Sequence, residues 1–228
     1  MIDPISDLGR LRDERIDWLL LALTGVLILL IFVFAPLQAL GITAFHLFAV
    51  GLLIVIIGAM VIISNSPTCV VLMSIALAAN VAVFFLRLYY PVPFHLHILG
   101  SAWLIIAGTL GMVVTRAVFR AGRVTYHRII GAILLYLLIA VAFATLFLFV
   151  GLLDPDAIKG ITFGDDQSLA SALFYLSFVT LTSTGYGDII PVHPLARSLC
   201  NIESVIGQLY PATLLARLVT LEMKGPGQ

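Results

Sequence analysis

Charged residues are scarce in this sequence. Only 11% of its 228 residues are Asp, Glu, Lys or Arg, whereas 61% are hydrophobic. Because a soluble domain is about half apolar and about a quarter charged, this composition excludes an ordinary soluble globular protein. Twelve basic and twelve acidic residues leave no net charge, so no partner nucleic acid and no electrostatic adhesion to lipid is indicated. We therefore expect the chain to lie within a membrane.

Cysteine is scarcer still, and the placement of the two cysteines argues against a disulfide framework or a metal site. Cys69 and Cys200 both lie in apolar stretches, where a thiol behaves as a small hydrophobic group. The sequence contains no recognisable nucleophile and base pair, no metal-ligand cluster and no nucleotide or calcium motif. We therefore expect no enzymatic activity and no cofactor.

Long apolar runs are abundant. A helix needs roughly 20 apolar residues to cross the hydrocarbon core, and the run that begins at Trp18 is too long for a cleaved signal peptide. We predict an all-α membrane protein with an N-terminal segment over residues 1–17, a tail over residues 223–228 and six transmembrane helices. The predicted spans cover residues 18–40, 43–63, 68–88, 94–119, 129–153 and 194–221.

The segment between the last two spans, residues 154–193, is too polar to cross and too long for an ordinary turn. Within it, residues 168–181 predict a short apolar helix, with Asp165 and Asp166 suited to its positive N-terminal end. This helix is too short to span. Exposed backbone polar groups are costly in lipid, so we expect a re-entrant segment buried within protein.

Basic residues predict the orientation. With the N-terminus in the cytoplasm, nine Lys and Arg lie on the inner side and three on the outer side, which satisfies the positive-inside rule. Both termini are then cytoplasmic, and the re-entrant segment opens to the outside. The inner group is Arg10, Arg12, Arg15, Arg116, Arg120, Arg123, Arg128, Arg217 and Lys224, and the outer group is Arg87, Lys159 and Arg197.

The sequence Thr-Ser-Thr-Gly-Tyr-Gly-Asp follows the short helix directly, at residues 182–188. It resembles the selectivity filter of tetrameric potassium channels, in which four strands present rings of backbone carbonyls that replace the hydration shell of the ion. Carbonyls that point the same way require positive φ at some residues, which Gly185 and Gly187 adopt without a Cβ clash. A simple turn is the alternative reading of Gly-Tyr-Gly-Asp alone, but the preceding helix and the flanking spans favour a filter.

This resemblance, to a bacterial six-transmembrane channel without a cytoplasmic regulatory domain, implies a role for each filter residue. One copy per chain implies a homotetramer in the inner membrane, surrounded by lipid. The ring of Tyr186 is expected to pack against Tyr175 and Phe178. The resemblance implies that Ser183 supplies the innermost hydroxyl and that the carboxylate of Asp188 ends the filter. The implied backbone carbonyl ligands are those of Thr182, Thr184, Gly185, Tyr186 and Gly187. The residues implied to bind K⁺ are Ser183, Thr184, Gly185 and Tyr186.

The sequence departs from the family pattern at three positions. Thr184 stands where Val or Ile is usual, and Ser183 stands where Thr is usual. Because of these two substitutions, a weakly selective monovalent cation channel is an alternative to a potassium channel. Val179 replaces a glutamate that some relatives pair with the aspartate after the filter, and Tyr175 is a substitute hydrogen-bond partner for Asp188. A multi-pass transporter is a further alternative, although no internal repeat supports it.

The sixth predicted span contains the candidate gate. Gly207 aligns with the bend of the inner helix, and Pro211 favours a kink. Helical spacing places Gln208, Pro211, Leu215 and Val219 on one face, which lines either the cavity or the contact with the fifth span. Glu203 is the only acid within a predicted span. It is expected either to concentrate cations in the cavity or to hydrogen-bond behind the filter with Asn201 or Ser204.

The first four spans, residues 18–119, resemble a voltage-sensor domain, followed by a pore domain over residues 120–222. Residues 94–115 contain no Lys or Arg, and Arg116, Arg120 and Arg123 come only at the cytoplasmic end. Positive-inside topology explains these arginines. Because voltage gating needs about 3–4 charges per subunit, we expect weak or absent voltage dependence.

Overall fold

The structure is a computed structural model. It describes residues 18–41, 51, 55, 58, 67–89, 94–118, 126–164 and 168–223. The predicted second span, the N-terminal segment over residues 1–17 and Asp165 and Asp166 thus lie wholly or largely outside the described residues. The description below concerns the remaining residues.

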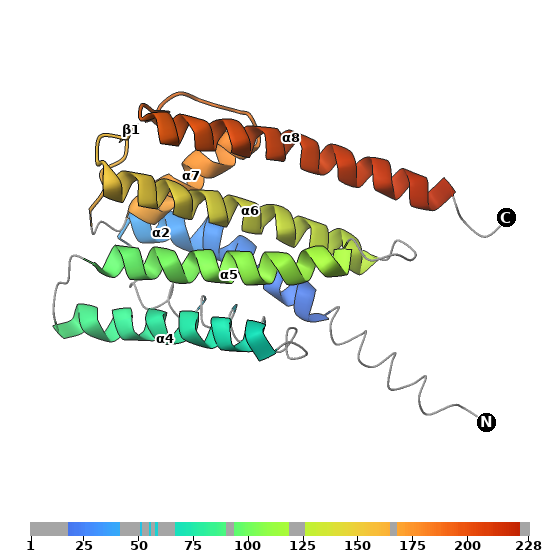
Figure 1. The fold of residues 1–228 in the computed structure, drawn as a ribbon, viewed down its shortest axis with the longest axis horizontal. Coiled ribbons are helices and arrows are strands. Elements are labelled where there is room, and N and C mark those ends of the chain that lie inside the picture. The colour runs from blue at the N-terminus through green and yellow to red at the C-terminus, as the bar shows by residue number, and fades with distance from the viewer. Residues whose placement is uncertain are drawn as a thin grey trace.

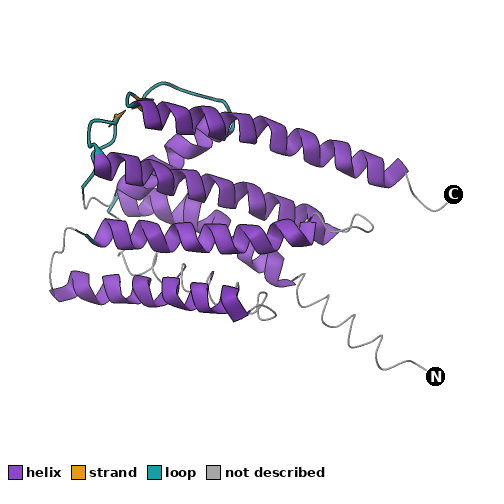
Figure 2. Cartoon of the chain, in the orientation of Figure 1, coloured by secondary structure: helices purple, strands orange, loops and turns teal. Residues whose placement is uncertain are grey.

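Helices account for nearly all of the described chain (Figure 2). Residues 18–29 form an α-helix that continues through a π-helical turn, η1 (Leu30–Phe34), into α2 (Ala35–Ala39). Pro36 lies in the first turn of α2, two residues after the π turn ends. Because proline lacks an N–H and its ring clashes with the preceding turn, a locally widened helix at this point has a physical cause.

The other helices agree closely with the predicted boundaries. They are α4 (Pro67–Tyr89), α5 (His95–Val118), α6 (Tyr126–Leu153), α7 (Leu169–Leu181) and α8 (Pro194–Met223). The structure therefore confirms the predicted positions of the short helix α7 and of its two long neighbours, α6 and α8. Within the described part of the chain, Trp18–Ala39, His95–Arg116 and Ile129–Leu153 are long and apolar enough to cross a membrane.

Two further predicted spans do not meet this requirement of length and apolarity. In α4, the apolar stretch whose side chains the structure describes covers Pro67–Val83, which is shorter than a membrane span. α8 is long, but it is not among the three candidates found in the described ranges. Polar residues such as Glu203 and Gln208 lower its hydropathy. The six-span arrangement thus remains a prediction, and the structure supports a mostly helical protein with three candidate membrane-spanning helices.

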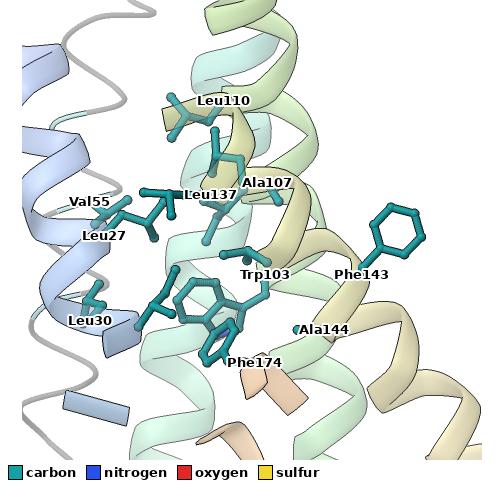
Figure 3. Packing of buried hydrophobic residues seen from close by; sticks show 14 of the residues in the cluster. Leu27, Leu30, Val55, Trp103, Ala107, Leu110, Leu137, Phe143, Ala144 and Phe174 are labelled. Atoms are coloured by element: carbon teal, nitrogen blue, oxygen red, sulfur yellow. The ribbon is translucent and has the colours of Figure 1, made fainter. Parts of the chain in front are cut away.

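The long helices lie side by side, with α5 packed against both α4 and α6 (Figure 1). α7 lies across the end of the bundle where α6 ends and α8 begins, and it contacts α2, α6 and α8. Aromatic and aliphatic side chains fill the centre. The Trp103 ring of α5 meets Phe174 of α7 edge-on at 6.5 Å (Figure 3). The short helix is therefore supported from several sides by the longer ones.

A two-stranded antiparallel sheet ties the loops on either side of α7 together. β1 (Ile158–Lys159) pairs with β2 (Ile190–Pro191), so that Ile158 lies opposite Pro191. The backbone N–H groups of Val192 and His193 both donate to the carbonyl of Ala157, at 2.9 and 3.1 Å. The chain that follows residue 188 is therefore fastened to the end of α6. Strands of two residues carry no alternation that a sequence pattern would reveal.

Candidate functional site

The chain reverses sharply at the end of α7. We call residues 182–188 the filter loop, after the selectivity filter that the sequence predicts there. Four N–H groups of the loop donate back to α7: Thr182 to the Phe178 carbonyl at 3.0 Å, Ser183 to the Thr180 carbonyl at 2.9 Å, and Thr184 and Gly185 to the Val179 carbonyl at 2.8 and 3.1 Å. These bonds satisfy carbonyls that a helix C-terminus leaves without partners. The start of the filter loop is therefore fixed by the helix that precedes it.

Both glycines of the loop have the positive φ that the sequence predicted. The φ angle is 55° at Gly185 and 82° at Gly187. No atom within the described chain lies within 4 Å of a Cβ built on either residue, so glycine is required here by backbone conformation and not by crowding within the subunit. Ser183 also has a positive φ of 55°, which a non-glycine residue rarely adopts. Nothing in the sequence indicated that feature.

Side-chain hydroxyls add a second set of bonds at the base of the loop. The Thr182 hydroxyl donates to the Phe178 carbonyl at 2.7 Å, and its Oγ1 lies 2.8 Å from Oγ1 of Thr184. Because the single proton of Thr182 is already used, the Thr184 hydroxyl is the donor in that pair. The threonine that replaces the usual Val or Ile is thus satisfied within its own subunit.

Aromatic packing links the filter loop to the middle of α7. The Tyr186 ring stacks on Tyr175 with centroids 6.3 Å apart and planes 5° apart. Tyr175 also hydrogen-bonds to the side chain of Asp188. The ring of Phe178 lies elsewhere, 4.9 Å from Phe32 in η1. Of the two predicted supports, Tyr175 contacts the filter tyrosine and Phe178 joins α7 to the first helix.

α8 lies against the back of α7 along a row of contacts that we call the polar seam, formed by Ser177, Thr180, Glu203 and Ser204. Ser177 Oγ lies 2.5 Å from Oε1 of Glu203, and the Ser204 hydroxyl donates to the Thr180 carbonyl at 3.1 Å. Beside the seam, Gly207 packs on the backbone of Leu181, so closely that a Cβ would overlap its carbonyl. The seam therefore brings α8 to the point where α7 ends.

The position of Glu203 in the structure is inconsistent with one of its two predicted roles. Its exposed fraction is 0%, so the carboxyl group cannot concentrate cations in a water-filled cavity of this chain. The position behind the filter loop agrees with the second role, but the partner is Ser177 of α7 and not Asn201 or Ser204. Asn201 is exposed. The sequence missed Ser177 because a serine in an apolar helix carries no pairing signal.

The candidate gate residues lie mostly on a free face of α8. Gln208, Pro211, Leu215 and Val219 are all exposed, which rules out packing of this face against α6. The helix is continuous through Gly207 and Pro211. The Gln208 amide reaches the filter loop and donates from Nε2 to Oγ of Ser183 at 3.0 Å. This face of α8 is therefore not covered by the described part of the chain.

The contact with α6 is made instead by a tyrosine that the sequence analysis did not single out. The Tyr210 hydroxyl donates to the Ala132 carbonyl at 2.8 Å, and its ring stacks on Tyr136 at 5.8 Å. This pair fixes α8 to α6 on the side remote from the sheet.

Comparison with known proteins gives one match. Residues 131–224 match a family model described as an ion channel, and this region includes most of α6, α7, the filter loop and α8. No curated protein and no solved structure matches the chain. The match and the apolar helices together indicate a membrane-embedded ion channel region with a role in ion passage.

Proposed function

We propose that this protein is a potassium channel that conducts K⁺ passively through a pore lined by the filter loop. The observation that carries the proposal is the conformation of residues 182–188, with positive φ at Gly185 and Gly187, directly after a short supported helix. Such a strand presents backbone carbonyls in succession, the arrangement that replaces the hydration shell of a potassium ion.

The proposed assembly is a homotetramer. All seven filter-loop residues are exposed in the single subunit, and the Tyr186 side chain is 72% exposed. Since each chain contributes one loop, a closed ring of carbonyls needs four copies around an axis. In this assembly K⁺ is held by groups of Ser183, Thr184, Gly185 and Tyr186.

We further propose that the channel responds weakly or not at all to voltage, and that it lies in the inner membrane with both termini in the cytoplasm. Within α5, which corresponds to the predicted fourth span, the basic residue is Arg116 in the last turn. A voltage-driven movement needs several charges within the membrane field, and α5 does not carry them.

The test is ion flux from liposomes that contain the purified protein. We expect efflux of potassium and rubidium, little efflux of sodium, and block by barium. Liposomes without protein are the control for leakage, and the Gly185→Ala variant should lose the preference for potassium. A second candidate is a weakly selective monovalent cation channel, favoured by Thr184 and Ser183. Reversal potentials in mixed potassium and sodium separate the two, because equal permeability would establish the second and overturn the first.

The bond between Tyr175 and Asp188 yields a separate prediction. Tyr175→Phe keeps the ring that stacks on Tyr186 but removes the hydroxyl that bonds to Asp188. A hydrogen bond to a charged group is stronger than one between neutral groups, so its loss removes a restraint on the Asp188 carboxylate. We therefore expect the conductance of this variant to decline at least several-fold faster during sustained opening, measured as current decay in planar bilayers.

The matched control for this prediction is Tyr126→Phe. Tyr126 begins α6 and lies far from the filter loop in the chain. Its variant should decay at the wild-type rate. An unchanged decay in Tyr175→Phe would show that the bond to Asp188 does not maintain the conducting state.

A further inference from the structure

The carboxyl group of Glu203 is buried in the described chain, and one of its oxygens lacks a hydrogen-bond partner. Its side chain is fully buried. Oε1 contacts Ser177 of α7, while Oε2 has no hydrogen-bond partner among the described residues. An ionised carboxylate without several donors is strongly unfavourable in a protein interior. The surroundings therefore favour a neutral carboxylic acid.

Counting protons at Ser177 leads to the same conclusion. Ser177 Oγ lies 2.5 Å from Oε1 of Glu203 and 2.8 Å from the carbonyl oxygen of Ala140. A serine hydroxyl carries a single proton, so it cannot donate to both oxygens. If Glu203 carries a proton, its O–H donates to Ser177 Oγ and the Ser177 O–H donates to Ala140. Only the neutral acid makes both contacts hydrogen bonds.

The neighbouring ionisable groups offer no compensating positive charge. The groups that interact electrostatically with Glu203 in the described chain include Tyr136 of α6 and Cys200 of α8. Both are neutral when protonated, and both become anions when they ionise. Neither stabilises a carboxylate at Glu203.

We propose that Glu203 is a positioning residue of the filter, and that its bound proton completes a chain of hydrogen bonds from α8 through Ser177 of α7 to the Ala140 carbonyl of α6. This inference rests on the proposed potassium channel function and deepens it. The proton links three helices at one point, and α7 is held between the other two.

The hydrogen bonds at Ser177 are expected to affect selectivity because Ser177 lies between two residues of α7 that support the filter loop. Ser177 lies two residues after Tyr175, whose ring stacks on Tyr186, and two residues before Val179, whose carbonyl accepts two N–H groups of the filter loop. A rotation or shift of α7 therefore moves both supports of the filter loop together. Fixing α7 at Ser177 fixes the diameter of the carbonyl ring.

The experiment compares three variants in liposomes and bilayers. Glu203→Gln replaces the acid by a neutral amide whose N–H donates to Ser177 Oγ as the acid does, so its potassium to sodium permeability ratio should stay within about twofold of wild type. Glu203→Ala and Ser177→Ala break the chain of bonds, and each should lower that ratio by about tenfold or more. A Glu203→Gln ratio that falls as far as that of Glu203→Ala would overturn the proposal.

Infrared spectroscopy supplies a readout that does not depend on conduction. At neutral pH the wild type should show the carbonyl band of a protonated, buried carboxyl group, and this band should be absent from Glu203→Gln. Asp156→Asn removes an exposed carboxyl group of the loop after α6 and should keep the band. A wild-type spectrum without the band would contradict the proposal even if the selectivity results agreed.

The two readouts separate failure of this inference from failure of the proposed function. If the wild type conducts without preferring potassium, the proposed function is wrong. The infrared band and a lowered unfolding temperature in Glu203→Ala and Ser177→Ala, but not in Glu203→Gln, would then still support the bound proton as the link between the helices. Equal unfolding temperatures in all variants would overturn that link.

Discussion

Replacing Gly207 by alanine is expected to reduce potassium flux more than tenfold. A Cβ at this position would overlap the carbonyl oxygen of Leu181 and approach the backbone of that residue closely. Backbone atoms cannot turn away as a flexible side chain can, so α8 must separate from the end of α7. Leu181 directly precedes the filter loop, and the separation therefore displaces the first filter residues.

Liposome flux and thermal unfolding of the purified protein together measure this effect. We expect flux to fall more than tenfold and the unfolding temperature to drop, since overpacking costs about 1–3 kcal/mol or more per subunit. Gly108→Ala is the matched control, because Gly108 lies within α5 and no neighbouring side chain or other helix of the described chain comes within 4 Å of a Cβ built there. Alanine is the better helix former there. Wild-type flux in Gly207→Ala would show that α8 does not need to approach α7 so closely.

Gly207 also illustrates how a glycine can be read in two ways. The alignment with channel inner helices predicts a bend at this residue. In the structure α8 continues as one helix through Gly207, and the residue is buried against α7. The structural requirement for glycine is thus close approach of two backbones.

Replacing Gly185 by alanine is expected to remove potassium selectivity. The φ angle of 55° at Gly185 lies in the left-handed region, where an L-residue with a Cβ is less stable by about 1–2 kcal/mol. In the proposed tetramer this strain occurs four times around one ring. The loop relieves it by turning the carbonyl away from the axis, so the ratio of potassium to sodium permeability should fall to about one.

Gly164→Ala is the matched control for the filter glycine. Gly164 lies before α7, has no positive φ and has no neighbour within 4 Å of a built Cβ. Its variant should keep the wild-type permeability ratio, measured from reversal potentials. A Gly185→Ala channel that still prefers potassium would show that the carbonyl of this residue does not line the conduction path.

Helix positions were predictable because they follow from local composition. The apolar run before Gly-Tyr-Gly predicted α7 within a residue of its observed start, and the glycines predicted their positive φ. Ser183 was not predictable in this way, since serine seldom adopts that conformation. Its strain depends on the turn that residues 180–185 make together.

Contacts between helices were harder to predict from the same sequence. The pairs Glu203 with Ser177 and Tyr210 with Ala132 join positions far apart in the chain. A single sequence gives the faces of helices but not their rotation or depth against one another. Helical periodicity alone predicted that four residues of α8 share one face. The structure agrees, since all four are exposed: Gln208, Pro211, Leu215 and Val219.

The pairing of β1 with β2 bears on how the protein folds. Ile158 meets Pro191, and this contact closes a loop that contains α7 and all of residues 182–188. Loop-closure entropy rises only slowly with loop length, whereas contacts that are local in sequence form quickly. The end of the chain that contains α7 and residues 182–188 can therefore acquire its topology as a local unit during synthesis, before the proposed association of four copies.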